Sequence, residues 1–295
     1  MSYYIIYSFF YLLSLIPWQI MYAISDGIYV LVFYVFKYRR DVVMQNLSIA
    51  FPDKQEAEKI IIAKAFYKNL IDTFLETIKL ISASDKEIAK RIECNTMHVL
   101  NDLYPDSQQV QLVCGHFFNW EFANYCIAQS SKFPFLGVYM PVANKGLNKL
   151  ICKVRCRYGT ILLPATNFKS AFLEYKDQPH AIGLAADQNP GNPADAYWMQ
   201  FFSKPAPFVK GPEKNARLYN SAVVYGDFYK TKRGYYRIDM QLITTTPHAY
   251  KEGYLALELK KRVEAAVRMR PANYLWSHRR WKHTYDTAKH GNLIE

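Results

Sequence analysis

His116 and Glu121 are the residues whose types and spacing best suit proton transfer. The apolar run from Val110 to Cys114 predicts a strand that stops just before His116, and Asn119 can cap a helix that carries Glu121. On one continuous helix, a step of five residues would set two side chains about 140° apart. We therefore expect His116 in the turn before the helix, with one imidazole nitrogen hydrogen-bonded to Glu121. The other nitrogen would be free to take a proton from a substrate hydroxyl.

A plainer interpretation makes His116 a partly buried turn residue and Glu121 a first-turn acid favoured by the helix dipole. Position favours the catalytic interpretation, because open α/β sheets gather their ligand sites at the carboxyl ends of strands. The sequence contains no Gly-x-Ser-x-Gly motif, and none of its five cysteines falls in a recognisable catalytic signature. We therefore favour direct transfer between two bound substrates over a covalent enzyme intermediate.

Alternating strand-like and helix-like segments predict the scaffold that positions this pair. Periodicity and capping patterns predict helices at 54–80, from 84 onward, at 145–158 and at 167–175, and short apolar runs predict strands at 110–114, 133–140, 160–163 and 181–185. We expect an α/β fold with a mainly parallel, mixed sheet flanked by helices. A hairpin formed by Ala222–Tyr229 and Tyr235–Ile243 would supply the antiparallel part.

Asp187 and Gln188 directly follow the predicted strand at 181–185, so their polar groups should lie at the same sheet edge as His116. A simple turn, capped by Asp187, is the competing interpretation. The pair shows no metal-ligand spacing, and the chain has no glycine-rich phosphate loop. We therefore expect neither a metal nor a nucleotide cofactor.

A basic helical stretch contains Arg155 and places Lys145, Lys149 and Lys153 on one face. For the lysines, a solvated face and a docking surface are equally good interpretations. A guanidinium suits bidentate binding of phosphate or carboxylate, which sets Arg155 apart from its neighbours.

The first 36 residues carry a single charge, Asp26, and are rich in Tyr, Phe and Trp. The segment from Ser2 to Ser25 is long enough to cross a hydrocarbon core, which needs about 20 apolar residues, but a buried or interfacial helix is the alternative. Basic residues at 37, 39 and 40 follow a second apolar stretch, and such residues mark the cytoplasmic side of a membrane segment. We therefore predict a membrane anchor at 1–36 and one cytoplasmic catalytic domain at 37–295.

Lys and Arg outnumber Asp and Glu by 37 to 25, which gives a net charge of +12. A basic body behind an aromatic start suits an anionic membrane face or an acidic protein partner. Nucleic acid is the competing partner, but no helix-turn-helix, zinc-finger or ribonucleoprotein pattern supports it. Near the end, Trp276 to His283 interleaves basic residues with tryptophans, which predicts either a basic helix end or a surface at the lipid headgroup layer.

The chain resembles the late acyltransferases of lipid A biosynthesis, the lauroyl and myristoyl transferases, which are related to glycerolipid acyltransferases. His116 to Glu121 matches the His-x4-Asp/Glu motif of that family. Further matches follow the family's order across nearly the whole chain: Asn46-Leu47, Phe51-Pro52, Arg155-x3-Gly159, Asp187-Gln188, Phe201-Phe202 and Tyr274 to Lys282. The family usually has glycine at the position of Phe118. It usually has Phe-Phe-Gly where this chain has Phe202 followed by Ser203. These departures leave the acyl-chain length and the acceptor open.

The resemblance implies a glycerolipid-acyltransferase-like fold that transfers a fatty acyl chain from acyl carrier protein to a hydroxyl of a lipid A precursor, at the cytoplasmic face of the inner membrane. It implies His116 as general base and Glu121 as its orienting acid. It also implies substrate-binding residues, namely Arg155, Asp187, Gln188 and Asn119. The alternatives are acylation of another glycolipid or of a polyene pigment head group by the same chemistry, and a lipid-binding membrane protein without catalysis.

Overall fold

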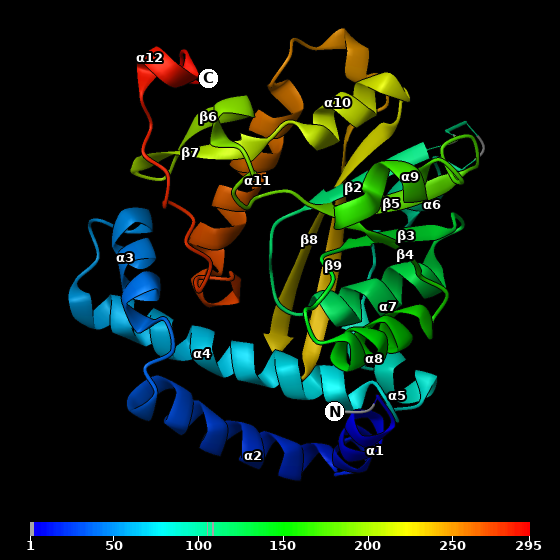
Figure 1. Ribbon diagram of the computed structural model, residues 1–295, viewed down its shortest axis with the longest axis vertical. Helices are drawn as coiled ribbons and strands as arrows, with labels where there is room; N and C mark the ends of the chain where they lie inside the picture. Colours follow the sequence, from blue (N-terminus) through cyan, green and yellow to red (C-terminus); the bar gives the residue numbers. More distant parts are fainter. Residues whose placement is uncertain (1–2, 105, 108) are drawn as a thin grey trace.

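The computed structural model describes residues 3–104, 106–107 and 109–295. Its main sheet has seven strands in the order β1-β9-β8-β2-β5-β3-β4 (Figure 1). The strands are β1 (Ile92–Glu93), β2 (Gln109–Cys114), β3 (Phe135–Tyr139), β4 (Ile161–Pro164), β5 (His180–Ala185), β8 (Ala222–Lys232) and β9 (Tyr235–Thr244). Neighbouring strands pair in parallel except β8 and β9, which form an antiparallel hairpin. The predicted α/β fold with a mainly parallel, mixed sheet is confirmed.

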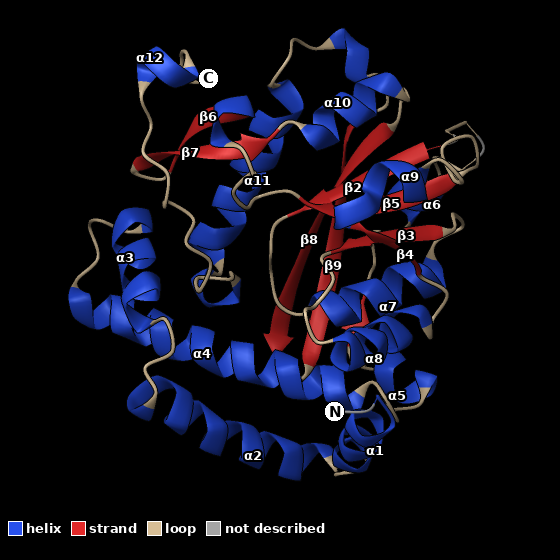
Figure 2. Ribbon diagram, in the orientation of Figure 1, coloured by secondary structure: helices blue, strands red, loops and turns tan. Residues whose placement is uncertain are grey.

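Helices cover both faces of this sheet (Figure 2). One face carries α7 (Trp120–Ser130) and α8 (Lys145–Cys156), and the other carries α9 (Phe168–Phe172), α10 (Gly211–Leu218) and α11 (Tyr254–Met269). Strand alternation produces the two faces, because successive side chains point in opposite directions. Leu136 of β3 and Ile182 of β5 accordingly pack with Phe172 of α9. The predicted helices at 145–158 and 167–175 are present, the second as a shorter helix.

The remaining helices frame the sheet, and α4 and α5 are the two that were predicted. They are α3 (Arg40–Ala50), α4 (Glu56–Lys79), α5 (Asp85–Ala89), α6 (His98–Asn101) and α12 (Thr287–His290). At the start of α5, the Ser84 hydroxyl accepts a hydrogen bond from the Glu87 backbone N–H at 3.3 Å, as a capping box requires. The long helix predicted at 54–80 is α4, whose apolar stripe packs into the core.

A second, two-stranded sheet was not expected from the sequence. Its strands β6 (Ala196–Phe201) and β7 (Lys204–Val209) form an antiparallel hairpin beside α11. Pro205 and Pro207 lie within β7, and proline normally argues against a strand because it removes a ladder donor. Both strands of a two-stranded ribbon are edge strands, so the missing donors are tolerated here.

The N-terminal region forms two helices rather than one. They are α1 (Tyr3–Ser14) and α2 (Trp18–Val30), and α2 continues into a π-helical turn at Leu31–Val35. The break falls at Leu15–Pro17, because proline fits the start of a helix but not its interior. Residues Trp18–Val35 are the one helix among the described residues that is long and apolar enough to cross a membrane.

Candidate active site

His116 and Asp187 meet because β2 and β5 are neighbours in register. Cys114 at the end of β2 pairs with Ala185 at the end of β5, so His116 and Asp187, each two residues further on, lie at the same level. The Asp187 carboxylate accepts a hydrogen bond from the His116 backbone N–H at 3.1 Å. The same oxygen, Oδ1, lies 2.5 Å from His116 Nδ1. This contact directs Nε2 away from Asp187 and leaves it available to exchange a proton.

The expected hydrogen bond between His116 and Glu121 is wrong, because Glu121 points to α8 instead. The Arg155 guanidinium donates to both Glu121 carboxylate oxygens, with Nη2 at 2.6 Å from Oε1 and Nε at 3.0 Å from Oε2. Trp120 Nε1 adds a third donor at 3.0 Å. Glu121 lies in the first turn of α7, which packs against α8, so Arg155 rather than the preceding turn is within its reach.

The turn that carries His116 is held by a segment from the far end of the chain. The Phe118 backbone N–H donates to the Asn273 carbonyl at 3.0 Å, and the Leu275 N–H donates to the His116 carbonyl at 3.1 Å. Phe117 and Tyr274 form an isolated antiparallel bridge between these two hydrogen bonds. The backbone on both sides of the imidazole is therefore fixed, which preorganises the His116–Asp187 pair.

Asp187 is fully buried, and its charge state is set by His116. Burial by itself would raise the pKa of Asp187, but the charge of His116 and the hydrogen bonds from it lower that pKa to about 2. Asp187 is therefore a carboxylate throughout the neutral range. The pKa of the nearby His278 is also lowered, to about 4, by burial and by the positive charge of Arg280, but for a histidine a lowered pKa favours the neutral form. His278 is neutral near pH 7 and adds no positive charge to the site.

Asn119 and Gln188 were expected to contact substrate, and they lie in different surroundings. The Asn119 side chain is buried, where its Oδ1 accepts from the Glu121 N–H at 2.9 Å and its Nδ2 donates to Glu76 at 2.8 Å. The predicted helix cap at Asn119 is confirmed, but its polar atoms are already engaged. Gln188 is half-buried in the turn after Asp187. Asn119 therefore positions the start of α7, and a substrate role for Gln188 stays a prediction.

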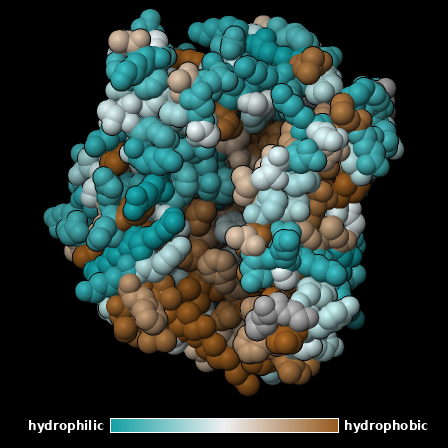
Figure 3. All heavy atoms as spheres, viewed as in Figure 1, coloured by the Kyte–Doolittle hydropathy of each residue, from teal (hydrophilic) through white to brown (hydrophobic). Residues whose placement is uncertain are grey.

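A cavity of about 360 Å³ opens beside His116, between the sheet and α7. Its polar mouth includes His116, Glu121 and Arg155, and its walls are mainly apolar: Leu112, Ala123, Ile127, Phe135, Val138, Leu162, Leu184, Phe228 and Ile238. The volume lies within the range of about 300–1,000 Å³ that is usual for small-molecule sites. In Figure 3 the molecule is hollowed at its centre, where Figure 1 places the chain between β2 and α7.

Glycines on three strands make room for this cavity. Gly137 of β3 and Gly183 of β5 are direct partners across the sheet, and Gly226 of β8 lies further along the same face. A Cβ atom at Gly183 would lie 2.9 Å from the Phe135 ring, which shows how closely that ring approaches. The sequence signal for this cavity is the isolated glycine inside each predicted strand, since such glycines often mark a close approach of another group.

The segment from Trp276 to His283 is only partly exposed, with Arg279 and Lys282 at the surface, so its contact with the headgroup layer stays a prediction for those residues. Trp276 and Arg280 are buried, at 0% and 1% exposure. The Arg280 guanidinium lies over the Phe208 ring at 4.4 Å and donates to Asn189 at 3.0 Å. This segment supports the site from within. Lys149 and Lys153 on α8 are exposed, as a solvated face requires, and their ammonium groups also lie over aromatic rings of α1, at 4.5 and 4.2 Å from the ring centroids of Tyr3 and Tyr7.

Comparison with known proteins relates the sequence of this chain to one bacterial family. Residues 1–283 match the model of the bacterial lipid A biosynthesis acyltransferase family. The lipid A biosynthesis lauroyltransferase of Escherichia coli (strain K12) is 24% identical over 268 residues, which cover 90% of this chain and 87% of that protein. The lipid A biosynthesis palmitoleoyltransferase of the same organism is 22% identical over 250 residues, covering 83% of this chain and 79% of that protein. The chain therefore belongs to the bacterial lipid A biosynthesis acyltransferase family.

Proposed function

We propose that this protein transfers a fatty acyl chain from an acyl-carrier-protein thioester to a hydroxyl of a lipid A precursor. The observation that carries the proposal is the His116–Asp187 pair at the mouth of an apolar cavity. An acyl chain needs an apolar channel, and its reacting carbonyl must lie at the polar end of that channel. The net charge of +12 suits both an acidic carrier protein and an anionic glycolipid.

In the proposed mechanism, His116 is the general base. Its Nε2 takes the proton of the acceptor hydroxyl while the hydroxyl oxygen attacks the thioester carbon. The tetrahedral intermediate then collapses to the ester and expels the carrier's thiolate, which is protonated by the imidazolium. Asp187 fixes the imidazole tautomer and stabilises the imidazolium, as the acid of a Ser-His-Asp triad does. The acyl group passes directly between the two substrates in a ternary complex.

We assign Glu121 a different role from the one its spacing predicted. It holds Arg155 at the cavity mouth through a bidentate ion pair, and the described residues offer no hydrogen-bond partner for Arg155 Nη1. That remaining donor group suits the developing oxyanion of the thioester or a phosphate of the acceptor. Burial by itself would lower the pKa of Arg155, but the Glu121 carboxylate raises it above its usual value, so the cation is retained.

Replacing Arg155 by alanine should destabilise the protein by about 3–5 kcal/mol, because it leaves the buried Glu121 carboxylate without its partner. Acyl transfer should fall with it. Lys149→Ala removes an exposed charge from the same helix and should change stability by less than about 1 kcal/mol. Urea unfolding of both variants would measure the difference, and equal losses would contradict a distinct role for Arg155.

Residues that line the cavity should determine acyl-chain length. Phe135 lies furthest from the catalytic edge in strand register, so Phe135→Ala should extend the cavity and favour longer chains. Gly226→Ala should favour shorter chains, since its Cβ would meet Leu112 at 3.4 Å, an ordinary contact, and occupy cavity space. One methylene in an apolar pocket changes kcat/KM by roughly 10- to 200-fold.

Competition between acyl thioesters of different length would measure these shifts. Gly211→Ala is the matched control for Gly226→Ala, because a Cβ at Gly211 on α10 meets open space. An unchanged chain-length profile in both cavity variants would place the acyl chain elsewhere.

The direct test of the proposed function is mass spectrometry of lipid A from cells with and without this protein. Loss of one acyl chain, restored by the wild-type gene but not by a His116 variant, is the expected result. If lipid A is intact and another glycolipid loses acyl groups, that glycolipid is the acceptor and the proposed reaction is unchanged.

We further propose that residues 37–295 form the catalytic domain and that it faces the cytoplasm at the inner membrane.

A further inference from the structure

The first two helices present an extended apolar surface. Of the 23 exposed large apolar residues among those described, 14 lie between Tyr4 and Tyr38. We call these the apolar belt: Tyr4, Ile5, Phe9, Tyr11, Leu12, Leu15, Ile20, Ile24, Val30, Leu31, Tyr34, Val35, Phe36 and Tyr38. Figure 3 shows an apolar lower edge of the molecule, where Figure 1 places α1 and α2. An apolar surface of this extent on a soluble protein marks an interaction site.

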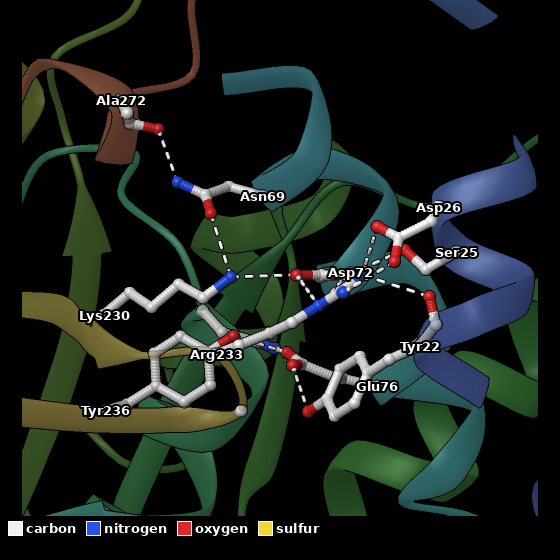
Figure 4. Close-up of polar contacts among 12 residues, drawn as sticks. Tyr22, Ser25, Asp26, Asn69, Asp72, Glu76, Lys230, Arg233, Tyr236 and Ala272 are labelled. Carbon is white, nitrogen blue, oxygen red and sulfur yellow. Dashed lines mark hydrogen bonds and ion pairs between the residues drawn. The ribbon is translucent and has the colours of Figure 1, made fainter. Parts of the chain in front are cut away.

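The opposite side of α2 is polar and is bonded to the catalytic body (Figure 4). Asp26 and Asp72 both accept hydrogen bonds from Arg233, which lies in the β8–β9 turn, at 2.9 and 2.8 Å. The Ser25 hydroxyl also donates to Asp72, at 2.7 Å, and the Tyr22 hydroxyl donates to Glu76 at 2.9 Å. Asp72 and Glu76 belong to α4, so α2 is attached to α4 and to the hairpin.

The corner between α1 and α2 is attached to α4 as well. The buried Lys79 ammonium, in the last turn of α4, donates to the carbonyls of Ser14 and Ile16 at 2.7 and 2.8 Å. Ser82 adds a hydrogen bond to the Ser14 carbonyl at 2.8 Å. These donors satisfy carbonyls that the end of a helix leaves free. The corner is therefore part of the folded body rather than a flexible tether.

These contacts are incompatible with α2 as a membrane-spanning helix. Asp26 lies in the middle of Trp18–Val35, so a spanning helix would place its carboxylate, and Arg233 with it, near the centre of the hydrocarbon core. The α4 helix, which runs alongside α2 in Figure 1, would have to enter the core too. An in-plane orientation avoids both costs, because only the apolar belt enters the lipid.

We propose that α1 and α2 lie parallel to the membrane and insert into one leaflet of an anionic bilayer, without crossing it. Lysines border the belt on two sides. Lys64 and Lys68 of α4 lie beside Tyr34 and Tyr29, at 5.7 and 5.3 Å from the ring centroids. Lysine side chains at such a border place their charges at the phosphate level, where each contributes about 1 kcal/mol on an anionic surface.

The α8 helix connects this membrane surface to the active site. Its Lys149 and Lys153 contact α1, whereas its Arg155 lines the central cavity. One helix therefore separates the belt from the cavity mouth. A lipid acceptor could reach His116 with its acyl chains still in the leaflet. The in-plane orientation itself does not depend on the proposed chemistry.

The first test is the side of the membrane on which the N-terminus lies. Full-length protein with one epitope tag at each end would be treated with protease in spheroplasts and in inverted inner-membrane vesicles. We expect both tags to be cut in inverted vesicles and neither in spheroplasts. A spanning α2 would expose the N-terminal tag in spheroplasts only, which would overturn the inference, as would an N-terminal tag cut only after detergent.

The second test measures binding of the purified full-length protein to vesicles of phosphatidylglycerol and phosphatidylethanolamine. Leu12→Asp in the belt should weaken binding roughly tenfold or more, because a leucine leaves the lipid. Leu173→Asp, directly after α9, is the matched control, since Leu12 and Leu173 are 66% and 61% exposed. Equal binding of the two variants would overturn the inference.

Charge provides a separate arm of this test. Lys149→Glu with Lys153→Glu should weaken binding to the anionic vesicles at low salt and have little effect on vesicles of phosphatidylcholine alone. The control, Lys169→Glu with Lys214→Glu, makes the same charge change on the other face of the sheet, on α9 and α10. If the control weakens binding as much as the α8 variant, the lysines beside α1 do not face the lipid.

Discussion

Replacing His116 by asparagine should lower the rate of acyl transfer by about 100- to 10,000-fold, which is the usual cost of losing a general base. Asparagine can still donate a hydrogen bond to Asp187 from a position close to that of Nδ1, so the buried carboxylate keeps a partner. It has no group that can take a proton from the acceptor hydroxyl. The variant should therefore fold and bind membranes normally and fail in the chemical step.

Initial rates with an acyl-carrier-protein thioester and a lipid A precursor would measure this loss, with thermal unfolding as the check on folding. His98→Ala, an exposed histidine on α6, controls for loss of an imidazole as such. His116→Ala should lose at least as much activity, and it also removes the side-chain partner of Asp187. Transfer at a near wild-type rate in His116→Asn would exclude His116 as the base.

Local patterns were enough to predict the strands and helices around the site. The apolar runs that end at Cys114 and Ala185 predicted two strands, and the polar residues after them were expected at one sheet edge. The partner of His116 could not be predicted in the same way. Strand order decides it, because β5 lies between β2 and β3 and brings Asp187 next to His116. Order within a sheet depends on packing between distant segments, which local periodicity does not record.

Glu121 illustrates the same limit on the helical side. Its spacing from His116 predicted that the two belong to one motif, and the cap at Asn119 predicted that Glu121 lies in the first turn of α7. Which neighbouring side chain it meets depends on how α8 packs against α7. Arg155, 34 residues further along the chain, could be identified as a candidate from its chemistry, but its pairing with Glu121 required the structure.

Neutral substitutions of Asp187 and Glu121 should therefore change different kinetic constants. Asp187→Asn should lower kcat by about 100- to 10,000-fold with little change in KM, because it removes the charge that stabilises the imidazolium and introduces an amide N–H that can favour the wrong imidazole tautomer. Glu121→Gln leaves the His116–Asp187 pair intact and frees Arg155 from its counter-ion, so its main effect should be on KM. Steady-state kinetics of the two variants would separate these outcomes.

Acid unfolding adds a readout that does not depend on activity. The pKa of Asp187 is lowered to about 2 in the folded protein, from an ordinary value of 3.8. Its ionised form therefore stabilises the fold above pH 3.8, and that contribution is lost as the pH falls toward 2. Asp187→Asn has no such titration, so the free energy of unfolding should depend less on pH in this window than it does in the wild type.

The kinetic prediction has a clear contrary outcome. If Glu121→Gln lost kcat to the extent expected of Asp187→Asn, and Asp187→Asn remained active, Glu121 would be the orienting acid and α7 would have to move toward His116 during the reaction.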